Sequence, residues 1–162
     1  MFNASVITCS DKGVKGLRED TSGEYIKKHL TDKGFSVVKK VIISDDLEII
    51  TETLLVHADE LKVDLIITTG GTGFSPRDNT PEATKNVIIR DVPGISEMLR
   101  AESFKVTSRA YLSRGVSGIR HRTLIINLPG SLKAVKENMS FLDDVLNHGL
   151  KVLKNVDKDC GN

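Results

Sequence analysis

The sequence predicts one α/β domain in which strands and helices alternate along the chain and build a mostly parallel sheet. Short, β-branched apolar runs alternate with segments of helical spacing, which is the pattern of βαβ units. One of these runs, Val63–Thr69, is almost continuously apolar and therefore suits a strand buried on both faces. The 162 residues suffice for a single domain with a sizeable core, and no repeat or linker divides them.

The first predicted elements are a strand and a helix. The apolar run Ala4–Thr8 ends at the turn-forming residues Ser10–Gly13, which indicates a buried strand that enters a loop. After this loop, the hydroxyl of Thr21 or Ser22 can cap a helix that runs to about Asp32, because hydroxyl oxygens accept hydrogen bonds from free backbone N–H groups. The chain therefore starts as a βα unit.

The later elements follow from β-branched runs, helical spacing and the Gly and Pro residues between them. A hydroxyl cap at Thr80, followed by Pro81 at the first helical position, opens a helix that runs to about Arg90. Tight turns separate the other elements. In chain order we expect a strand over Phe35–Ile43, a helix over Leu47–Glu60, the strand Val63–Thr69, a helix over Ile95–Phe104, short extended pieces at Leu112–Arg114 and Val116–Ile119, the strand Thr123–Leu128 and a helix over Leu132–Leu153. Residues 1–154 then form one domain, and residues 155–162 form a polar tail.

Charge and hydropathy exclude two classes of partner. The 23 basic and 22 acidic residues leave a net charge of +1, so no bulk electrostatic attraction to nucleic acid or to an anionic membrane is expected. No apolar run reaches the roughly 18 residues of a membrane span, and the amino terminus lacks the pattern of a signal peptide. Cys9 in an apolar run and Cys160 in a polar stretch predict a buried thiol and a surface thiol rather than a disulfide, which favours the cytoplasm.

The glycine-rich segment after the third predicted strand is the strongest candidate site. Gly70, Gly71 and Gly73 fall within four residues, so the backbone can bend there and approach a ligand closely. Successive N–H groups in such a loop bind anions, and the helix that opens at Pro81 adds free N–H groups and a positive dipole end. The segment therefore predicts a phosphate site, with a ligand-free tight turn as the alternative.

Two aspartates on separate loops are candidate ligands of a metal–nucleotide complex. Asp78 lies on the glycine-rich loop and Asp45 directly after the second predicted strand, so both should face the carboxyl edge of the sheet. A carboxylate beside a phosphate requires a cation, and Mg²⁺ binds few carboxylates together with substrate phosphates. Alternatively, Asp45 only caps the following helix, a position for which Asp46 competes. Arg77 can offset transition-state charge or pair with a carboxylate, and Glu82 can cap its helix or approach the metal.

The segment Thr68–Thr84 reads TTGGTGFSPRDNTPEAT and closely resembles the motif TTGGTGxSPRDxTPEAT of the MogA/MoaB family, the molybdopterin adenylyltransferases and their relatives. Supporting stretches are Ser10-Asp11, Ser113-Arg114 and LIINLPGS at Leu124–Ser131, and the resemblance extends from about Ala4 to Leu153. The chain departs from the family at Phe74, Asn79, His121-Arg122 and Leu132, but it keeps SPRD and both aspartates.

The resemblance implies a three-layer α/β/α, Rossmann-like domain that assembles as a homotrimer or a hexamer. It implies transfer of AMP from Mg-ATP to the terminal phosphate of molybdopterin, with release of pyrophosphate, ahead of a molybdate-inserting enzyme. Asp45 and Asp78 match the family's catalytic acidic residues. The expected substrate and nucleotide site is formed by Ser10, Asp11, Gly70, Gly71, Thr72, Gly73, Ser75, Arg77, Glu82, Ser113, Arg114, Asn127, Pro129, Gly130 and Ser131.

Three other functions compete with this interpretation. A non-catalytic molybdopterin-binding or scaffolding member of the same family would be favoured by loss of Asp45 or Asp78, and both are present. A different phosphotransferase with the same loop would bind ATP and be indifferent to the pterin. A plain α/β interaction domain would leave the side chains of residues 70–84 without a role.

Overall fold

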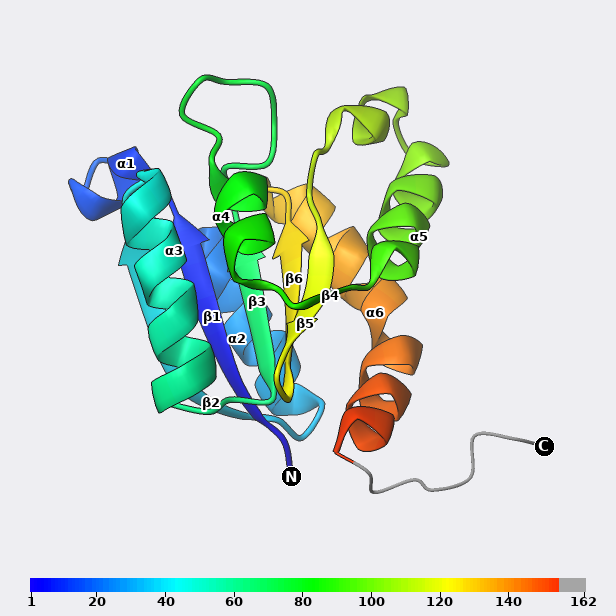
Figure 1. Ribbon diagram of the computed structural model, residues 1–162. Coiled ribbons are helices and arrows are strands. Elements are labelled where there is room, and N and C mark those ends of the chain that lie inside the picture. Colours follow the sequence, from blue (N-terminus) through cyan, green and yellow to red (C-terminus); the bar gives the residue numbers. More distant parts are fainter. Residues whose placement is uncertain (155–162) are drawn as a thin grey trace.

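A computed structural model describes residues 1–154; the predicted polar tail, residues 155–162, and Cys160 within it lie outside the described residues. The described chain alternates strands and helices (Figure 1). The strands are β1 (Asn3–Cys9), β2 (Ser36–Ile43), β3 (Leu65–Thr69), β4 (Arg90–Asp91), β5 (Ser117–Arg120) and β6 (Thr123–Leu128). The α-helices are α1 (Asp11–Val14), α2 (Thr21–Asp32), α3 (Leu47–Leu55), α4 (Thr80–Val87), α5 (Pro93–Phe104) and α6 (Leu132–Leu153), with a π-helical turn at Val56–Glu60 and a 3₁₀ helix at Ser108–Leu112.

The central sheet has the order β2-β1-β3-β6-β5-β4. β1 pairs in parallel with β2 and β3, and β3 pairs in parallel with β6, whereas β5 and β4 extend the sheet in antiparallel fashion. All five residues of β3 are buried, as its continuous apolar sequence predicted. The predicted mostly parallel α/β sheet is therefore confirmed.

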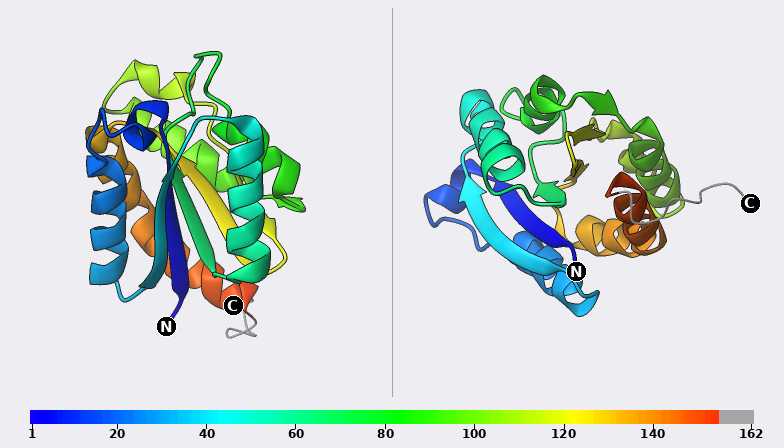
Figure 2. Two further views of the ribbon diagram at one scale, coloured as in Figure 1. Left: turned by 90° about the vertical axis from the view of Figure 1, so that its left-hand side faces the viewer. Right: turned by 60° about the horizontal axis from the view of Figure 1, so that its bottom comes forward.

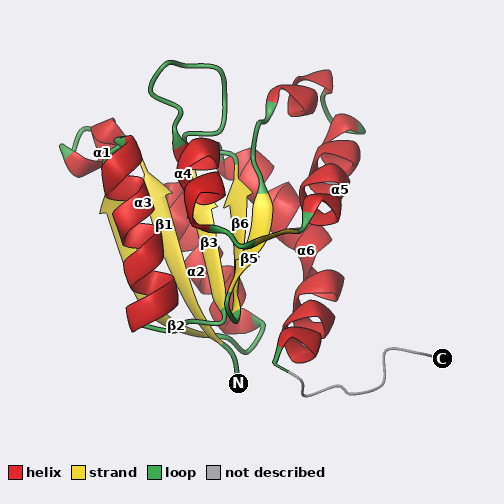
Figure 3. Ribbon diagram, viewed as in Figure 1, coloured by secondary structure: helices red, strands yellow, loops and turns green. Residues whose placement is uncertain are grey.

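Helices cover both faces of this sheet and give three layers (Figures 2 and 3). Alternate residues of β3 point to opposite faces, because side chains of a strand alternate. Leu65 and Ile67 pack in a core with α2, α5 and α6, and Ile66 packs in a second core with α3 and α4. Cys9 is buried in the second core, as predicted. None of the helices within residues 1–154 combines the length and apolar character of a membrane span.

Two predicted helix caps are wrong. The start of α2 is capped by Asp20, which accepts a hydrogen bond from the Gly23 N–H at 2.9 Å, and not by a hydroxyl of Thr21 or Ser22. At α4, the Thr80 hydroxyl donates to the carbonyl of Gly70 at 2.9 Å, so it fixes the glycine-rich loop instead of capping the helix. In both cases a different hydrogen bond forms in place of the expected one.

Several element boundaries also differ from the prediction, and three of the differences change the type of structure. The helix expected to reach Arg90 ends at Val87, because Arg90 and Asp91 pair with β5 as a short edge strand. Leu112, which was expected to begin an extended stretch, is instead the last residue of the 3₁₀ helix. The helix expected over residues 47–60 is α-helical only to Leu55 and continues as the π-helical turn. By contrast, β6 and α6 have the predicted bounds.

Candidate active site

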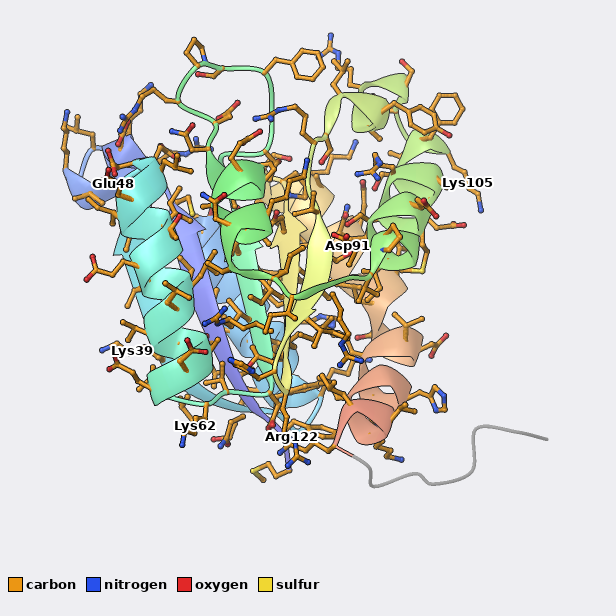
Figure 4. The ribbon with its side chains drawn as sticks, in the orientation of Figure 1. Lys39, Glu48, Lys62, Asp91, Lys105 and Arg122 are labelled. Atoms are coloured by element: carbon orange, nitrogen blue, oxygen red, sulfur yellow. The ribbon has the colours of Figure 1, made fainter. Side chains whose placement is uncertain are left out.

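A cleft of about 950 Å³ opens at the edge of the sheet where β1, β3 and β6 end. This is the upper edge in Figure 1, and it follows from parallel pairing, because parallel strands end at the same edge. The charged side chains of Lys39, Lys62 and Lys105 point outward from the periphery instead (Figure 4) and do not line the cleft. Thirteen predicted site residues line it: Ser10, Asp11, Asp45, Gly70, Gly71, Thr72, Gly73, Asp78, Ser113, Asn127, Pro129, Gly130 and Ser131.

The glycine-rich loop turns sharply at Gly70 and Gly71, whose φ angles are +93° and +65°. A Cβ atom at Gly70 would lie 2.4 Å from the backbone oxygen of Cys9, and one at Gly71 would lie 2.4 Å from the Thr80 hydroxyl oxygen. Only glycine adopts these conformations without strain and fits this close approach to β1. The sequence therefore forces a bare backbone to form this wall of the cleft.

Asp45 and Asp46 have different roles although they are adjacent. Asp46 caps α3, because its carboxylate accepts hydrogen bonds from the backbone N–H groups of Glu48 and Ile49 at 3.0 and 3.2 Å. Asp45 does not cap the helix: its Oδ2 accepts a hydrogen bond from the backbone N–H of Asp11 at 2.8 Å, and it lines the cleft. Of the two alternatives for the cap, the structure selects Asp46.

Burial raises the pKa of Asp45, and repulsion from the carboxylates of Asp11 and Asp78 raises it further. Asp78 belongs to the loop after β3, and its Oδ2 accepts a hydrogen bond from the Ser75 N–H at 2.9 Å. Each of the two aspartates uses one carboxylate oxygen in these contacts and leaves Oδ1 without a hydrogen-bond partner among residues 1–154. Two loops thus place two mutually repelling carboxylates at one cleft, an arrangement that a cation would relieve.

Arg77 pairs with Asp11 rather than pointing into the cleft. Its Nε and Nη2 donate to the two carboxylate oxygens of Asp11 at 3.1 and 3.0 Å, and this pairing lowers the pKa of Asp11. Arg77 itself does not line the cleft, and neither does Ser75. The ion pair therefore joins the loop after β3 to the loop after β1 at the surface.

Arg114 and Glu82 hold the glycine-rich loop from the side that faces away from the cleft. Arg114 donates through Nε to the carbonyl of Gly73 at 2.7 Å and through Nη2 to the carbonyl of Asp78 at 2.6 Å, and it forms an ion pair with Glu82. The guanidinium group of Arg114 lowers the pKa of Glu82. Neither residue lines the cleft, so both act on the site through the loop.

The turn after β6 forms the floor of the cleft. The Asn127 side chain donates to the hydroxyls of Thr68 and Thr84 at 3.0 and 2.9 Å, so it ties β6 to β3 and α4. The carbonyl of Gly130 accepts a hydrogen bond from the Ser22 hydroxyl at 2.9 Å, and Ser131 caps α6. This floor joins the glycine-rich loop to the start of α6.

Comparison with known proteins decides the family. Residues 5–148 match a family model described as a probable molybdopterin binding domain. The chain belongs to this family. The resemblance to the MogA/MoaB family is thereby confirmed, and it covers most of the chain.

Several relatives of this molybdopterin-binding domain carry functional names. A molybdopterin adenylyltransferase of Helicobacter pylori is 42% identical over 84% of this chain and 78% of its own length. The Escherichia coli K12 protein of that name is 36% identical over 90% of this chain and 77% of its own length. The solved structure of the molybdopterin biosynthesis enzyme MoaB of Thermus thermophilus is 42% identical, with a TM-score of 0.90 over 96% of this chain and 98% of that one.

The cleft extends beyond the predicted residues, between the 3₁₀ helix and helices α5 and α6. Sequence reasoning missed this part because its residues are scattered over three separate elements, and no motif joins them. Asp20 was missed as well: it lines the cleft, caps α2 and pairs with Lys40 at 2.6 Å. Its position directly before a predicted helix start was the available signal. The lining residues from the 3₁₀ helix and helices α5 and α6 include Ser96, Leu99, Arg100, Ser103, Arg109, Lys133, Glu137 and Asn138.

Proposed function

We propose that this molybdopterin-binding domain is an enzyme that transfers AMP from ATP to the terminal phosphate of molybdopterin and releases pyrophosphate. One observation carries the proposal: Asp45 and Asp78, from separate loops, line one cleft beside a glycine turn of positive φ. Relatives at 36–42% identity are named molybdopterin adenylyltransferase. A cleft of about 950 Å³ lies at the upper end of small-molecule sites and has room for two reactants.

The reaction requires positioning and charge neutralisation more than proton transfer. A terminal phosphate oxygen of molybdopterin forms a bond to the α-phosphorus of ATP, and the bond from that phosphorus to the bridging oxygen of pyrophosphate breaks. The nucleophile is already an anion, so no general base is needed. Backbone N–H groups of Gly70–Gly73 and the Thr72 hydroxyl would hold phosphate oxygens next to the reacting atoms.

Asp45 and Asp78 would hold Mg²⁺ together with the phosphates of ATP. Within residues 1–154, no group of three or more His, Cys, Asp or Glu side chains forms a complete metal site. Two carboxylates, each with an oxygen that lacks a hydrogen-bond partner, fit an ion that takes its remaining ligands from phosphate and water. When bound, Mg²⁺ would neutralise phosphate charge.

The assembly and cellular setting are further parts of the proposal. We expect a homotrimer or a hexamer, as in the family that the chain resembles, and a product that a molybdate-inserting enzyme consumes in the cytoplasm. The expected ligands are ATP, Mg²⁺ and molybdopterin, and we expect no nucleic acid or membrane partner.

Incubation with ATP, Mg²⁺ and molybdopterin tests the proposal. We expect pyrophosphate release that requires molybdopterin and stops when Mg²⁺ is chelated. Release that is independent of molybdopterin would favour a different nucleotide-dependent enzyme. Molybdopterin binding without any release would favour a non-catalytic or scaffolding role.

A further inference from the structure

Glu137 has an unusual position in the part of the cleft between the 3₁₀ helix and helices α5 and α6. It is half-buried on α6 and lines the cleft together with Lys133, Ala134 and Asn138. These residues share one face of the helix, because they follow the three- and four-residue spacing. Within residues 1–154, the Glu137 carboxylate has no hydrogen bond or ion pair.

Asn138, the next residue along this face, makes hydrogen bonds of its own. The Asn138 amide donates to the Ser103 hydroxyl at 3.0 Å and to the carbonyl of Ala134 at 2.8 Å. These bonds fasten α6 to α5 and give the wall beside Glu137 a fixed shape. A carboxylate on the cleft wall that has no protein partner can accept hydrogen bonds from a ligand that brings donors.

The chemistry of a carboxylate selects among the heterocycles of the two reactants. An ionised carboxylate accepts hydrogen bonds and donates none. A pterin ring presents two adjacent donors, its N3–H and its 2-amino group, which match the two oxygens of one carboxylate. Adenine presents a donor next to the acceptor N1, so one carboxylate oxygen would face a lone pair. The side chain of Leu99, buried in the same part of the cleft, offers an apolar surface for a ring face.

We propose that Glu137 recognises the N3–H and 2-amino edge of the pterin ring, and that the part of the cleft between α5 and α6 holds the pterin end of molybdopterin. This inference rests on the proposed function. Glu137 is then a specificity-determining residue outside the glycine-rich motif, and the cleft has two parts. The nucleotide occupies the part formed by the loops after β1, β2 and β3.

Kinetics of Glu137→Gln provide the first test. The amide replaces one acceptor with a donor, so a pair of charge-assisted hydrogen bonds is lost. We expect KM for molybdopterin to rise by about 10- to 100-fold, with KM for ATP and kcat at saturation almost unchanged. The matched control is Asp144→Asn, which removes an exposed carboxylate from the same helix outside the cleft and should change neither constant. An unchanged KM for molybdopterin, or a rise confined to KM for ATP, would overturn the inference.

Direct binding separates this inference from the proposed function, because it needs no turnover. The probes are pterin and lumazine, which has a 2-oxo group in place of the 2-amino group. The wild-type protein should bind pterin about tenfold more tightly than lumazine, and Glu137→Gln should bring the two affinities close together. Equal affinities in the wild type, undetectable pterin binding, or a preference retained by the variant would each contradict the role of Glu137. Pterin preference without adenylyl transfer would contradict only the proposed function.

Discussion

The two parts of the cleft use different physical means. Around Gly70 and Gly71, the wall is backbone with positive φ, and the nearby side chains are mutually repelling carboxylates. Between α5 and α6, the wall consists of side chains on regular helices, and it contains the Glu137 carboxylate, which has no hydrogen bond or ion pair among residues 1–154. The first arrangement suits phosphates and a cation, whereas the second suits a ring with hydrogen-bond donors. Substitutions in the first part should therefore alter turnover or folding, and substitutions in the second should alter substrate affinity.

Asp78→Asn should give the largest effect. We expect kcat to fall by about 10²–10³-fold, because one of the two carboxylates available for Mg²⁺ is lost. The amide oxygen can still accept the hydrogen bond from Ser75, so the melting temperature should change little. Pyrophosphate release and thermal unfolding measure the two quantities. Normal turnover by a variant of unchanged stability would remove Asp78 from the mechanism.

Asp45→Asn should lower kcat in the same way but stabilise the fold at neutral pH. The raised pKa of Asp45 means that its ionised form is disfavoured in the folded protein, so stability is lost as the pH rises through that pKa. The neutral amide avoids this loss. The gain in melting temperature should vanish below the unfolded pKa of about 3.9, where wild-type Asp45 is also neutral.

The adjacent Asp46 provides the matched control for Asp45. Asp46→Ala should lower the free energy of unfolding by about 1 kcal/mol, because it removes the cap of α3, and should leave turnover intact. Thermal melts across pH compare the two variants. A loss of stability in Asp45→Asn at neutral pH would show that its contact with the Asp11 N–H outweighs the burial and repulsion.

Gly70→Ala should destabilise the fold by about 3 kcal/mol, because its φ of +93° is strained for alanine and its Cβ would meet the Cys9 backbone oxygen at 2.4 Å. The control is Gly16→Ala, where φ is +69° but no atom lies within 4 Å of the added Cβ. That variant should lose only about 1 kcal/mol. Denaturant unfolding measures both. Equal losses would indicate that the loop moves away from β1 without cost.

Arg77→Gln should give the smallest effect. Arg77 is paired with Asp11 at the surface and does not line the cleft, so we expect kcat to fall by less than about fivefold. Steady-state kinetics at saturating ATP and molybdopterin measure it. A loss near that of Asp78→Asn would mean that Arg77 leaves Asp11 during turnover and stabilises the transition state.

The predictable features of the site were those encoded in contiguous residues. The glycines among residues 70–73 permit a sharp turn of the backbone, and the proline at residue 81 favours a helix start. The position of that loop therefore followed from the sequence. The competition between Asp45 and Asp46 was also visible, but only the hydrogen bonds to Glu48 and Ile49 decided it.

The features that could not be predicted depend on packing between distant segments. Thr80 has the residue type of a cap, yet the carbonyl of Gly70 lies within its reach only after the loop folds back. Arg114 is 32 positions from Glu82, so no pattern of neighbouring residues in the sequence predicts their ion pair. Glu137 resembles any surface glutamate of a helix until α5 is placed beside α6.

The destination of the phosphorus atoms tests the central claim most directly. Molybdopterin and Mg²⁺ are incubated in parallel with ATP labelled at its α-phosphate and with ATP labelled at its γ-phosphate, and the pterin product is isolated from each. Adenylyl transfer predicts that the pterin acquires the α label and that the γ label leaves in pyrophosphate. A pterin that carries the γ label, or ATP consumption that leaves the pterin unlabelled in both reactions, would contradict the account.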